Sequence, residues 1–372
     1  MRDLPPIAQL QTRKSAIAQS RVVQTPGPNA LEPGEVLFGL HRFALTTNNI
    51  TYAVFGDSMR YWDFFPTGDS EWGHMPVWGY GDVIASRAEG VGLGERFYGF
   101  FPIASQLQVK AASIKPQGFM DGSEHRQRLS PIYNFYSRCS ADDPAMPLVF
   151  EDAQLIVRPL FTTAFLCADF LQAQDCFGAR RIVISSASSK TAYATAHCLK
   201  VGSAVERVGL TSQANRAFVE STRCYHQVLG YDALDQLAPD VPTLYLDFAG
   251  SVALRTAVRE RLGTSLVHDC VVGATQNSPA SQGTRWPDPR PAFFFAPDQG
   301  QKRMAEWGAS VFRERLGHAQ IDFLRTVTEG PSPLLTLAHG QGFLAAATVI
   351  DALVAGQVDP RQGHVISPED PA

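Results

Sequence analysis

Apolar and polar positions in the second half of the chain alternate in blocks that predict strands followed by helices. Ile182, Val183 and Ile184 form a short β-branched run, the small or polar residues 185–190 follow, and the alanine-rich stretch Thr191–Leu199 contains neither glycine nor proline. This is the pattern of a buried strand, a tight turn and a helix. A buried strand that enters a helix through a short loop opens a doubly wound α/β sheet.

The same alternation continues towards the C-terminus. Short apolar runs predict further strands at Glu206–Ser212, Thr243–Asp247, Ser265–Gly273 and Ala292–Ala296. Helical patterns occupy Thr162–Gln174, with Thr162 as its N-cap, and Asn215–Ser221, Val252–Leu262, Gln301–Phe312 and Gly342–Ala355. Strands that alternate with helices predict a parallel sheet covered by helices on both faces.

The first half of the chain has a different pattern, with strands and glycine-rich turns. Glu35–Asn48 alternates like a strand, and a glycine turn separates a strand at residues 83–86 from one at Arg96–Phe101, which together predict a β-barrel-like domain. Asn49–Asp57 predicts a turn or short helix. The polar segment Ser113–Pro147 is predicted to be ordered, as a functional lid or as an interface, because it is rich in aromatic residues.

Composition narrows the class of protein. The 372 residues are enough for two domains, 45% are apolar, and the net charge of −4 without a long basic run argues against nucleic acid as the main partner. No stretch at the N-terminus resembles a signal peptide and no later run approaches a membrane span, so we expect a cytoplasmic protein without a membrane partner. The six scattered cysteines predict free, buried thiols.

Several short motifs together resemble the medium-chain dehydrogenase/reductase superfamily, on its zinc-free quinone-oxidoreductase and enoyl-reductase side. Gly90 through Phe100 is similar to that family's G-V…G-D-R-V-x-G-F signature, and Gly363–Ile366 lies where the family has G-K-V-V. Thr163-Ala164 is similar to its L-T-A-Y, and Asp247–Gly250 to its D-x-x-G strand end. The chain is identified as a divergent member of an uncharacterised branch.

The resemblance implies an α/β protein with a GroES-like β-barrel domain and a Rossmann-type doubly wound parallel sheet. We expect the barrel domain in residues 1–150, completed by 320–372, and the dinucleotide-binding domain in residues 151–319. The family also makes a homodimer across the edge of the α/β sheet reasonable.

The turn after the first α/β strand departs from the family's glycine motif, roughly G-A-x-G-G-V-G. Small or polar residues replace every glycine, and the candidates for phosphate contact are Ser186, Ser188, Ser189, Lys190 and Thr191. Serine and alanine are the smallest substitutes, and serine hydroxyls donate to phosphate oxygens. The alternative is that the site has lost its nucleotide and that Lys190 points to solvent.

The end of the second α/β strand favours NADP over NAD. No carboxylate that could bind a ribose diol occurs between Thr211 and Arg216, whereas Ser212 and Arg216 suit a 2′-phosphate. The alternative is that Arg216 is an ordinary residue on a helix surface. Gly273, at the end of the fourth predicted strand, completes the candidate cofactor site. We expect no catalytic zinc, because His74 is isolated and Cys139 is the only cysteine before the α/β part of the chain.

The resemblance also supplies candidate catalytic residues. In zinc-free relatives an Asn, with a Tyr nearby, lies beside the nicotinamide after the first long strand, and residues 48–52 resemble that stretch. Asn49 would orient cofactor or substrate and Tyr52 would donate a proton. The alternative, that Asn48 and Asn49 form a turn and Tyr52 belongs to the core, stays open.

These observations predict an NADPH-dependent, metal-independent reductase of an α,β-unsaturated carbonyl or quinone-like small molecule. One alternative is a non-redox descendant of the fold that serves as a binding or interaction protein without nucleotide. A weaker alternative is a lyase that uses the cofactor structurally.

Overall fold

A computed structural model describes residues 5–140, 147–200, 204–272 and 291–368 of the chain. The chain divides into two compact units. The first combines Met1–Ile156 with Thr336–Ala372, so it is built from both ends of the sequence. The second is Val157–Leu335.

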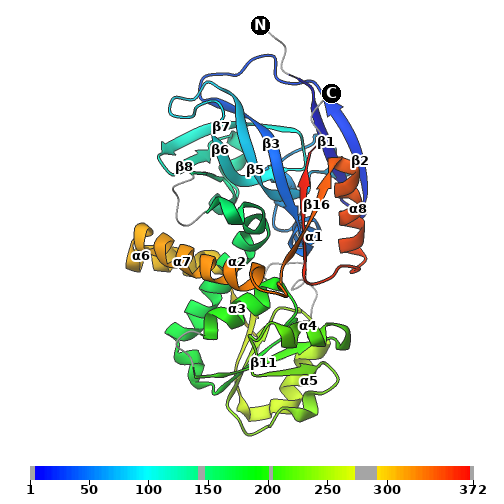
Figure 1. Ribbon diagram of the computed structural model, residues 1–372, viewed down its shortest axis with the longest axis vertical. Coiled ribbons are helices and arrows are strands. Elements are labelled where there is room, and N and C mark those ends of the chain that lie inside the picture. Colours follow the sequence, from blue (N-terminus) through cyan, green and yellow to red (C-terminus); the bar gives the residue numbers. More distant parts are fainter. Residues whose placement is uncertain (1–4, 141–146, 201–203, 273–290, 369–372) are drawn as a thin grey trace. The chain divides into compact units, whose positions relative to one another are not determined.

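Six antiparallel strands close a barrel in the first unit (Figure 1). In order around the barrel they are β3 (Glu35–Leu45), β5 (Pro76–Ser86), β6 (Arg96–Pro102), β9 (Phe135–Arg138), β8 (Gly118–Asp121) and β7 (Gln106–Lys115). Pairing of β3 with β7, from Glu35 opposite Lys110 to Gly39 opposite Gln106, closes the ring. Closure removes the free edges of the sheet, which confirms the predicted barrel.

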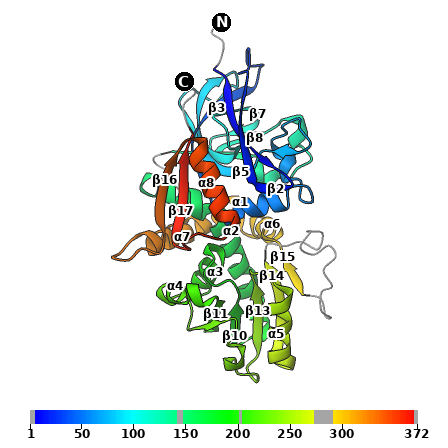
Figure 2. The same ribbon diagram turned by 90° about the vertical axis from the view of Figure 1, so that its right-hand side faces the viewer.

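The C-terminal part of the chain extends the barrel. Strand β17 (Gln362–Ser367) pairs antiparallel with β3, and β16 (Thr336–Gln341) pairs parallel with β17. Helix α8 (Gly342–Val354) lies alongside both strands (Figure 2). The N-terminal hairpin of β1 (Ile7–Arg13) and β2 (Ala16–Thr25), the two-residue strand β4 (Trp72–Gly73) and helix α1 (Thr47–Val54) complete this unit.

The barrel interior is packed with aromatic rings, which explains why phenylalanine is so abundant in the sequence. The Phe38 ring lies 5.3 to 6.1 Å, between ring centroids, from four others: Phe97, Phe101, Phe119 and Tyr136. Gly99 makes room for this cluster, because a Cβ atom there would lie 2.4 Å from the Tyr136 ring. Successive side chains of a strand point to opposite faces, so these rings all point into the barrel. A glycine on a neighbouring strand leaves the space that a large ring needs.

The second unit contains a six-stranded, fully parallel sheet. Its strands lie in the order β12 (Gln227–Gly230), β11 (Glu206–Thr211), β10 (Arg181–Ile184), β13 (Thr243–Asp247), β14 (Leu266–Val272) and β15 (Ala292–Phe294). Numbered along this unit, that is the 3-2-1-4-5-6 order of dinucleotide-binding sheets. The predicted Rossmann-type sheet is thus confirmed, and its direction of winding reverses between β10 and β13.

Helices cover both faces of this sheet. They are α2 (Glu151–Ala173), α3 (Lys190–Lys200), α4 (Arg216–Ser221), α5 (Val252–Leu262), α6 (Ala296–Trp307) and α7 (Ala309–Thr328). Val183 of β10 belongs to the same buried cluster as Val258 and Leu262 of α5. Ile182 and Ile184, which alternation directs to the opposite face, are also fully buried.

Three expectations from the sequence were wrong. Thr162 is no N-cap, because α2 begins at Glu151 and the Thr162 hydroxyl donates to the Arg158 carbonyl one turn earlier. The helix predicted at Gln301–Phe312 is two helices, α6 and α7, which meet at Gly308 with φ of 82°. Residues Leu148–Ala173 are long and apolar enough to span a membrane by length and composition alone, a test that the core helices of globular domains also pass. The prediction that no run of the sequence approaches a membrane span is therefore wrong.

Candidate functional site

The turn that follows β10 keeps a glycine-like backbone although it contains no glycine. We call residues 185–189 the serine turn. Ser186 has φ of 50°, in the left-handed region that favours glycine, and it stands where the resemblance expects the first glycine of the motif. The turn leads into α3, whose first residue is Lys190.

Neighbouring residues hold the serine turn in this shape. Ala187 is fully buried, and a Cβ atom on Gly209 of β11 would lie 2.9 Å from the Ala187 side chain. The Tyr225 hydroxyl donates to the Ala187 carbonyl at 3.0 Å, and the Asn215 amide donates to the Ser188 hydroxyl oxygen at 3.2 Å. The close approach that glycine usually provides inside the turn is supplied here by a glycine on the adjacent strand.

Ser189 caps α3, because its hydroxyl oxygen accepts the Ala192 N–H at 3.3 Å. Lys190 and Thr191 form the first turn of this eleven-residue helix. The N-terminus of a helix attracts anions through its dipole and its unpaired N–H groups. The five predicted phosphate contacts thus lie in the serine turn and the first turn of α3, and their role in binding stays a prediction.

The other cofactor candidates are more dispersed. Ser212 directly follows β11, and Arg216 begins α4, where its guanidinium pairs with Glu220 at 3.0 Å on the surface of the helix. Such an exposed ion pair is what the alternative predicts, in which Arg216 is an ordinary residue on a helix surface. Gly273 lies outside the described residues.

Asp247 ties the two strands at the switch point together. Its carboxylate accepts the Ser185 hydroxyl at 2.6 Å and the N–H groups of Ala249 and Gly250. Behind it, Arg255 of α5 donates to Asp247 at 2.5 Å and pairs with Asp269 at 3.2 Å. Asp247 is 1% exposed and Arg255 is fully buried. A buried network of charges therefore holds the loop that follows β13.

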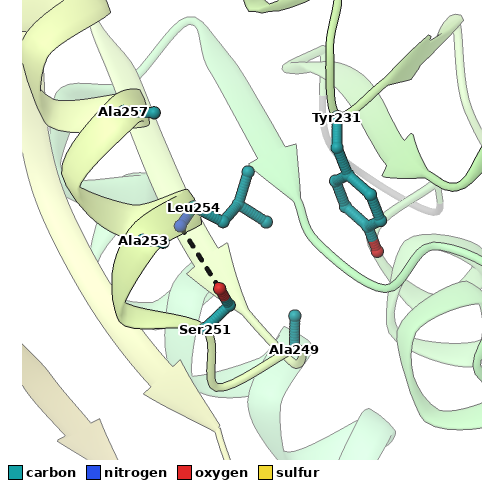
Figure 3. A pocket seen from close by; sticks show the side chains of 6 residues that line it. All are labelled: Tyr231, Ala249, Ser251, Ala253, Leu254 and Ala257. Atoms are coloured by element: carbon teal, nitrogen blue, oxygen red, sulfur yellow. Dashed lines mark hydrogen bonds between the residues drawn. The ribbon is translucent and has the colours of Figure 1, made fainter.

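A cavity of about 420 Å³ opens beside this loop (Figure 3). Its walls are Tyr231, which follows β12, and residues of the β13–α5 loop and of α5: Ala249, Ser251, Ala253, Leu254 and Ala257. Figure 3 shows the Tyr231 ring facing the start of α5 across the cavity. Burial raises the pKa of the Tyr231 phenol, and the hydrogen bond from the Ser186 N–H to its hydroxyl offsets this rise only in part.

In the first unit, Asn49 has a structural position in helix α1. Its side-chain oxygen accepts the Thr46 N–H at 2.8 Å, which closes a capping box, and its amide donates to the Pro76 carbonyl at 2.9 Å. Asn49 is only 3% exposed. These contacts satisfy the amide within the protein, and a role towards cofactor or substrate stays a prediction.

Tyr52 lies one turn further along α1, inside a cluster of aromatic side chains. Its hydroxyl accepts the Asn48 amide at 2.7 Å and the Trp78 indole N–H at 3.0 Å. Burial raises the pKa of Tyr52 far above its ordinary value, so the phenol keeps its proton at neutral pH. Its predicted function as a proton donor stays a prediction.

In the segment Ser113–Pro147, three polar side chains have structural roles. Arg126 is buried against Asp121 and donates to the Asn134 side chain, and the Tyr136 hydroxyl donates to the Phe100 carbonyl. Tyr133 differs, because its hydroxyl lies 3.0 Å from that of Tyr61 and its ring packs against Tyr52. It therefore joins the cluster around α1.

Among the residues that the structure describes, no group of three or more His, Cys, Asp or Glu side chains is arranged to hold a metal ion. His74 hydrogen-bonds the Phe65 carbonyl and the Gln9 side chain. The six cysteines are free. The predicted metal independence is not tested by these observations.

Sequence reasoning missed Tyr231, Ser185 and the structural role of Asp247. The position of Tyr231 could not be predicted, because the strand before it, β12, has only four residues and no clear alternation of apolar and polar positions. Asp247 was noticed only as part of a D-x-x-G strand end. Its signal was the arginine eight residues later, on the inward face of α5.

A closed barrel built from both ends of the chain, combined with a parallel sheet of this strand order, defines the two-domain fold of medium-chain dehydrogenases and reductases. The chain itself belongs to the family described as "Protein of unknown function (DUF2855)", whose model matches residues 43–359. No curated protein matches the sequence.

Solved structures with the same fold cover almost the whole chain. The quinone oxidoreductase from Coxiella burnetii is 15% identical, with a TM-score of 0.53 over 98% of this chain and 100% of that one. CurA in complex with NADPH from Vibrio vulnificus is 13% identical, with a TM-score of 0.56 over the same shares. The yhdH oxidoreductase from Salmonella enterica in complex with NADP is 13% identical, with a TM-score of 0.51, again over 98% and 100%. At this identity the likeness confirms the expected resemblance at the level of fold.

Proposed function

We propose that the chain is an NADPH-dependent reductase that acts, without a metal, on an α,β-unsaturated carbonyl or quinone-like small molecule. One observation carries the proposal: the serine turn and the 420 Å³ cavity lie together at the switch point of the parallel sheet. Ligands of doubly wound sheets bind at such switch points, where the strands' carboxyl ends diverge.

The residues at the switch point fit a dinucleotide. The Ser188 oxygen accepts from Asn215, which leaves the Ser188 proton free to be donated to a phosphate. The cavity has apolar walls of alanine and leucine and one tyrosine ring, which suit the flat face of a nucleobase. Ser212 and Arg216 supply hydroxyl and guanidinium donors for a 2′-phosphate, with no competing carboxylate between residues 211 and 216.

The likeness to folds solved with NADPH and NADP supports the choice of cofactor. Bound NADPH would supply the hydride. The chain's own contribution would be to bind the nucleotide through the serine turn, Lys190 and Thr191, and to hold a neutral phenol beside the substrate. In the barrel unit, Tyr52 would be this phenol, as the resemblance implies, and Asn48 and Trp78 hydrogen-bond its hydroxyl. A cytoplasmic homodimer remains part of this proposal.

A non-redox descendant of the fold is the second candidate. It is favoured by the Tyr231 hydroxyl, which faces the Ser186 N–H at the turn where a nucleotide would be bound. If Tyr231 holds this position permanently, the turn binds its own side chain instead of a ligand. The two candidates differ in whether the protein binds NADPH at all.

Titration of NADPH fluorescence with a charge-reversed variant tests the proposed site. Lys190→Glu should weaken NADPH binding at least about tenfold, because it replaces attraction to a phosphate with repulsion. Lys302→Glu, on the exposed surface of α6, is the matched control and should bind NADPH like the wild type. Equal affinity in both variants would show that the start of α3 does not hold a phosphate.

A further inference from the structure

A buried arginine at the start of β11 has no carboxylate partner among the described residues. Four arginines are buried in the part of the chain that the structure describes: Arg126, Arg181, Arg207 and Arg255. Arg126 and Arg255 pair with carboxylates. Arg181 pairs with none that is described, but its guanidinium donates three hydrogen bonds of 3.0 Å or less to neutral oxygens. Arg207 also forms no ion pair with a described residue, and its hydrogen bonds are poorer.

The neighbours of Arg207 satisfy its guanidinium only in part, although the residue is just 5% exposed. Its Nε donates to the Cys224 carbonyl at 2.9 Å. Its Nη1 reaches the Val205 carbonyl at 3.4 Å, which is a long hydrogen bond. Its Nη2 lies 3.5 Å from Nε2 of His226, the residue that precedes β12.

The hydrogen bonds of His226 show that this last contact joins two donors. Nδ1 of His226 accepts the Arg207 backbone N–H at 2.9 Å, and the His226 backbone N–H donates to the Arg207 carbonyl at 2.8 Å. Partial desolvation of the ring and the Arg207 charge lower the pKa of His226, so the ring is neutral at pH 7. A neutral imidazole whose Nδ1 accepts carries its proton on Nε2. The Nε2–H of His226 and the Nη2–H groups of Arg207 therefore face each other, and an acceptor between them would satisfy both.

The surroundings of this pair are accessible and carry an excess of positive charge. His226 and Lys200, the last residue of α3, are exposed. Burial raises the pKa of the Cys224 thiol and the Lys200 charge opposes this rise, so the ammonium lies on the same side of the sheet as Cys224 and His226. Of the described carboxylates, Glu206 alone acts on His226. Alternation along β11 directs Glu206 and Arg207 to opposite faces of the sheet.

We propose that Arg207, His226 and Lys200 form an oxyanion site that takes a phosphate group, either inorganic phosphate or a small phosphate monoester. The three donors come from β11, the turn before β12 and the end of α3. A phosphate group offers three or more acceptor oxygens to them, whereas a carboxylate offers two. The site lies at the amino ends of the parallel strands, at the opposite edge of the sheet from the serine turn. It is therefore separate from the proposed nucleotide site and does not depend on the proposed function.

Phosphorus NMR of the purified chain tests the site, with inorganic phosphate and phenyl phosphate as the two probes and acetate as a planar competitor at constant ionic strength. His226→Asn keeps an oxygen that can accept the Arg207 backbone N–H, as Nδ1 does, but removes the Nε2–H donor. Lys200→Gln removes an exposed charge and keeps the test valid if His226→Asn destabilises the fold. Lys302→Gln, on the exposed surface of α6, is the matched control.

Binding should broaden the phosphorus resonance of the probe, and the probe that binds more tightly identifies the source of the phosphate group. His226→Asn and Lys200→Gln should each raise the dissociation constant about tenfold, the effect of losing one hydrogen bond to a charged group. Lys302→Gln should leave it within about twofold of the wild type.

Three results would overturn the assignment. The first is a wild-type protein that broadens neither resonance, and the second is acetate that competes as well as phosphate does. The third is binding that is lost in Lys190→Glu but kept in His226→Asn and Lys200→Gln, because the phosphate would then lie at the serine turn.

Discussion

Arg255 shows how much a single buried residue can matter at the switch point. It is fully buried and contacts two carboxylates, Asp247 and Asp269, which lie on adjacent strands. Asp247 in turn positions the N–H groups of Ala249 and Gly250 beside the cavity. The guanidinium thus fixes the wall of the proposed nucleotide site through charge pairing rather than through contact with a ligand.

Replacing Arg255 by methionine should lower the free energy of unfolding by about 3–5 kcal/mol, because the buried Asp247 carboxylate loses its charged partner, whereas Asp269 keeps Arg259. The measurement is urea unfolding of purified protein at neutral pH. Arg216→Met, which breaks an exposed pair on α4, is the control and should change stability by less than about 1 kcal/mol. Equal losses in both variants would contradict the buried-pair account.

At the level of elements, the strand β11 and the serine turn depend on each other. The turn carries Ala187 where the family resemblance expects small residues, and Gly209 of β11 leaves the space that the Ala187 side chain fills. The sequence predicted the strand, the turn and the helix here, because each has a strong local pattern. It could not predict Gly209 as the partner of Ala187, since that contact joins residues far apart in the chain.

Gly209→Ala should disturb this packing. The new methyl group would lie 2.9 Å from the Ala187 side chain and 3.0 Å from the Tyr225 ring. We expect a loss of about 1–3 kcal/mol in stability and weaker NADPH binding, measured by urea unfolding and by fluorescence titration. Gly300→Ala in helix α6 meets only Leu166, at 3.5 Å, and should be neutral or slightly stabilising. NADPH binding that survives Gly209→Ala unchanged would separate the turn from the nucleotide.

The catalytic candidates illustrate what local patterns miss. The Asn and Tyr of residues 48–52 do lie on one short helix, yet the Asn49 amide is used by the helix cap and by the Pro76 carbonyl. Tyr133 comes from a 3₁₀ turn more than seventy residues away in sequence, at Pro131–Tyr133. Only the folding of the barrel unit brings its ring to Tyr52, so local patterns in the sequence could not predict this contact.

At the scale of the whole molecule, five histidines favour the neutral form in the folded state. Burial is the main cause that lowers the pKa of His41, His74, His197, His226 and His268 below the ordinary value. The unfolded chain, with histidine pKa values near about 6.5, binds more protons than the folded protein when the pH falls through that value. The free energy of unfolding should therefore rise with pH across this range.

Urea unfolding at several pH values between about 5 and 7 tests this expectation, since the unfolding midpoint should increase with pH. His74→Gln should make the dependence shallower, because His74 is 5% exposed and hydrogen-bonded on both ring nitrogens. His318→Gln, on the exposed surface of α7, is the control and should leave the slope as it is. A midpoint that falls as the pH rises would contradict the sign of these shifts.

The central claim is that a serine turn, shaped by a glycine on the next strand, still binds a dinucleotide at the switch point. It is tested most directly by unfolding the wild-type protein with and without NADPH. At a hundredfold excess over the dissociation constant, NADPH should raise the apparent free energy of unfolding by about 2.7 kcal/mol. Unfolding curves that coincide with and without NADPH, NADP or NAD would contradict the claim.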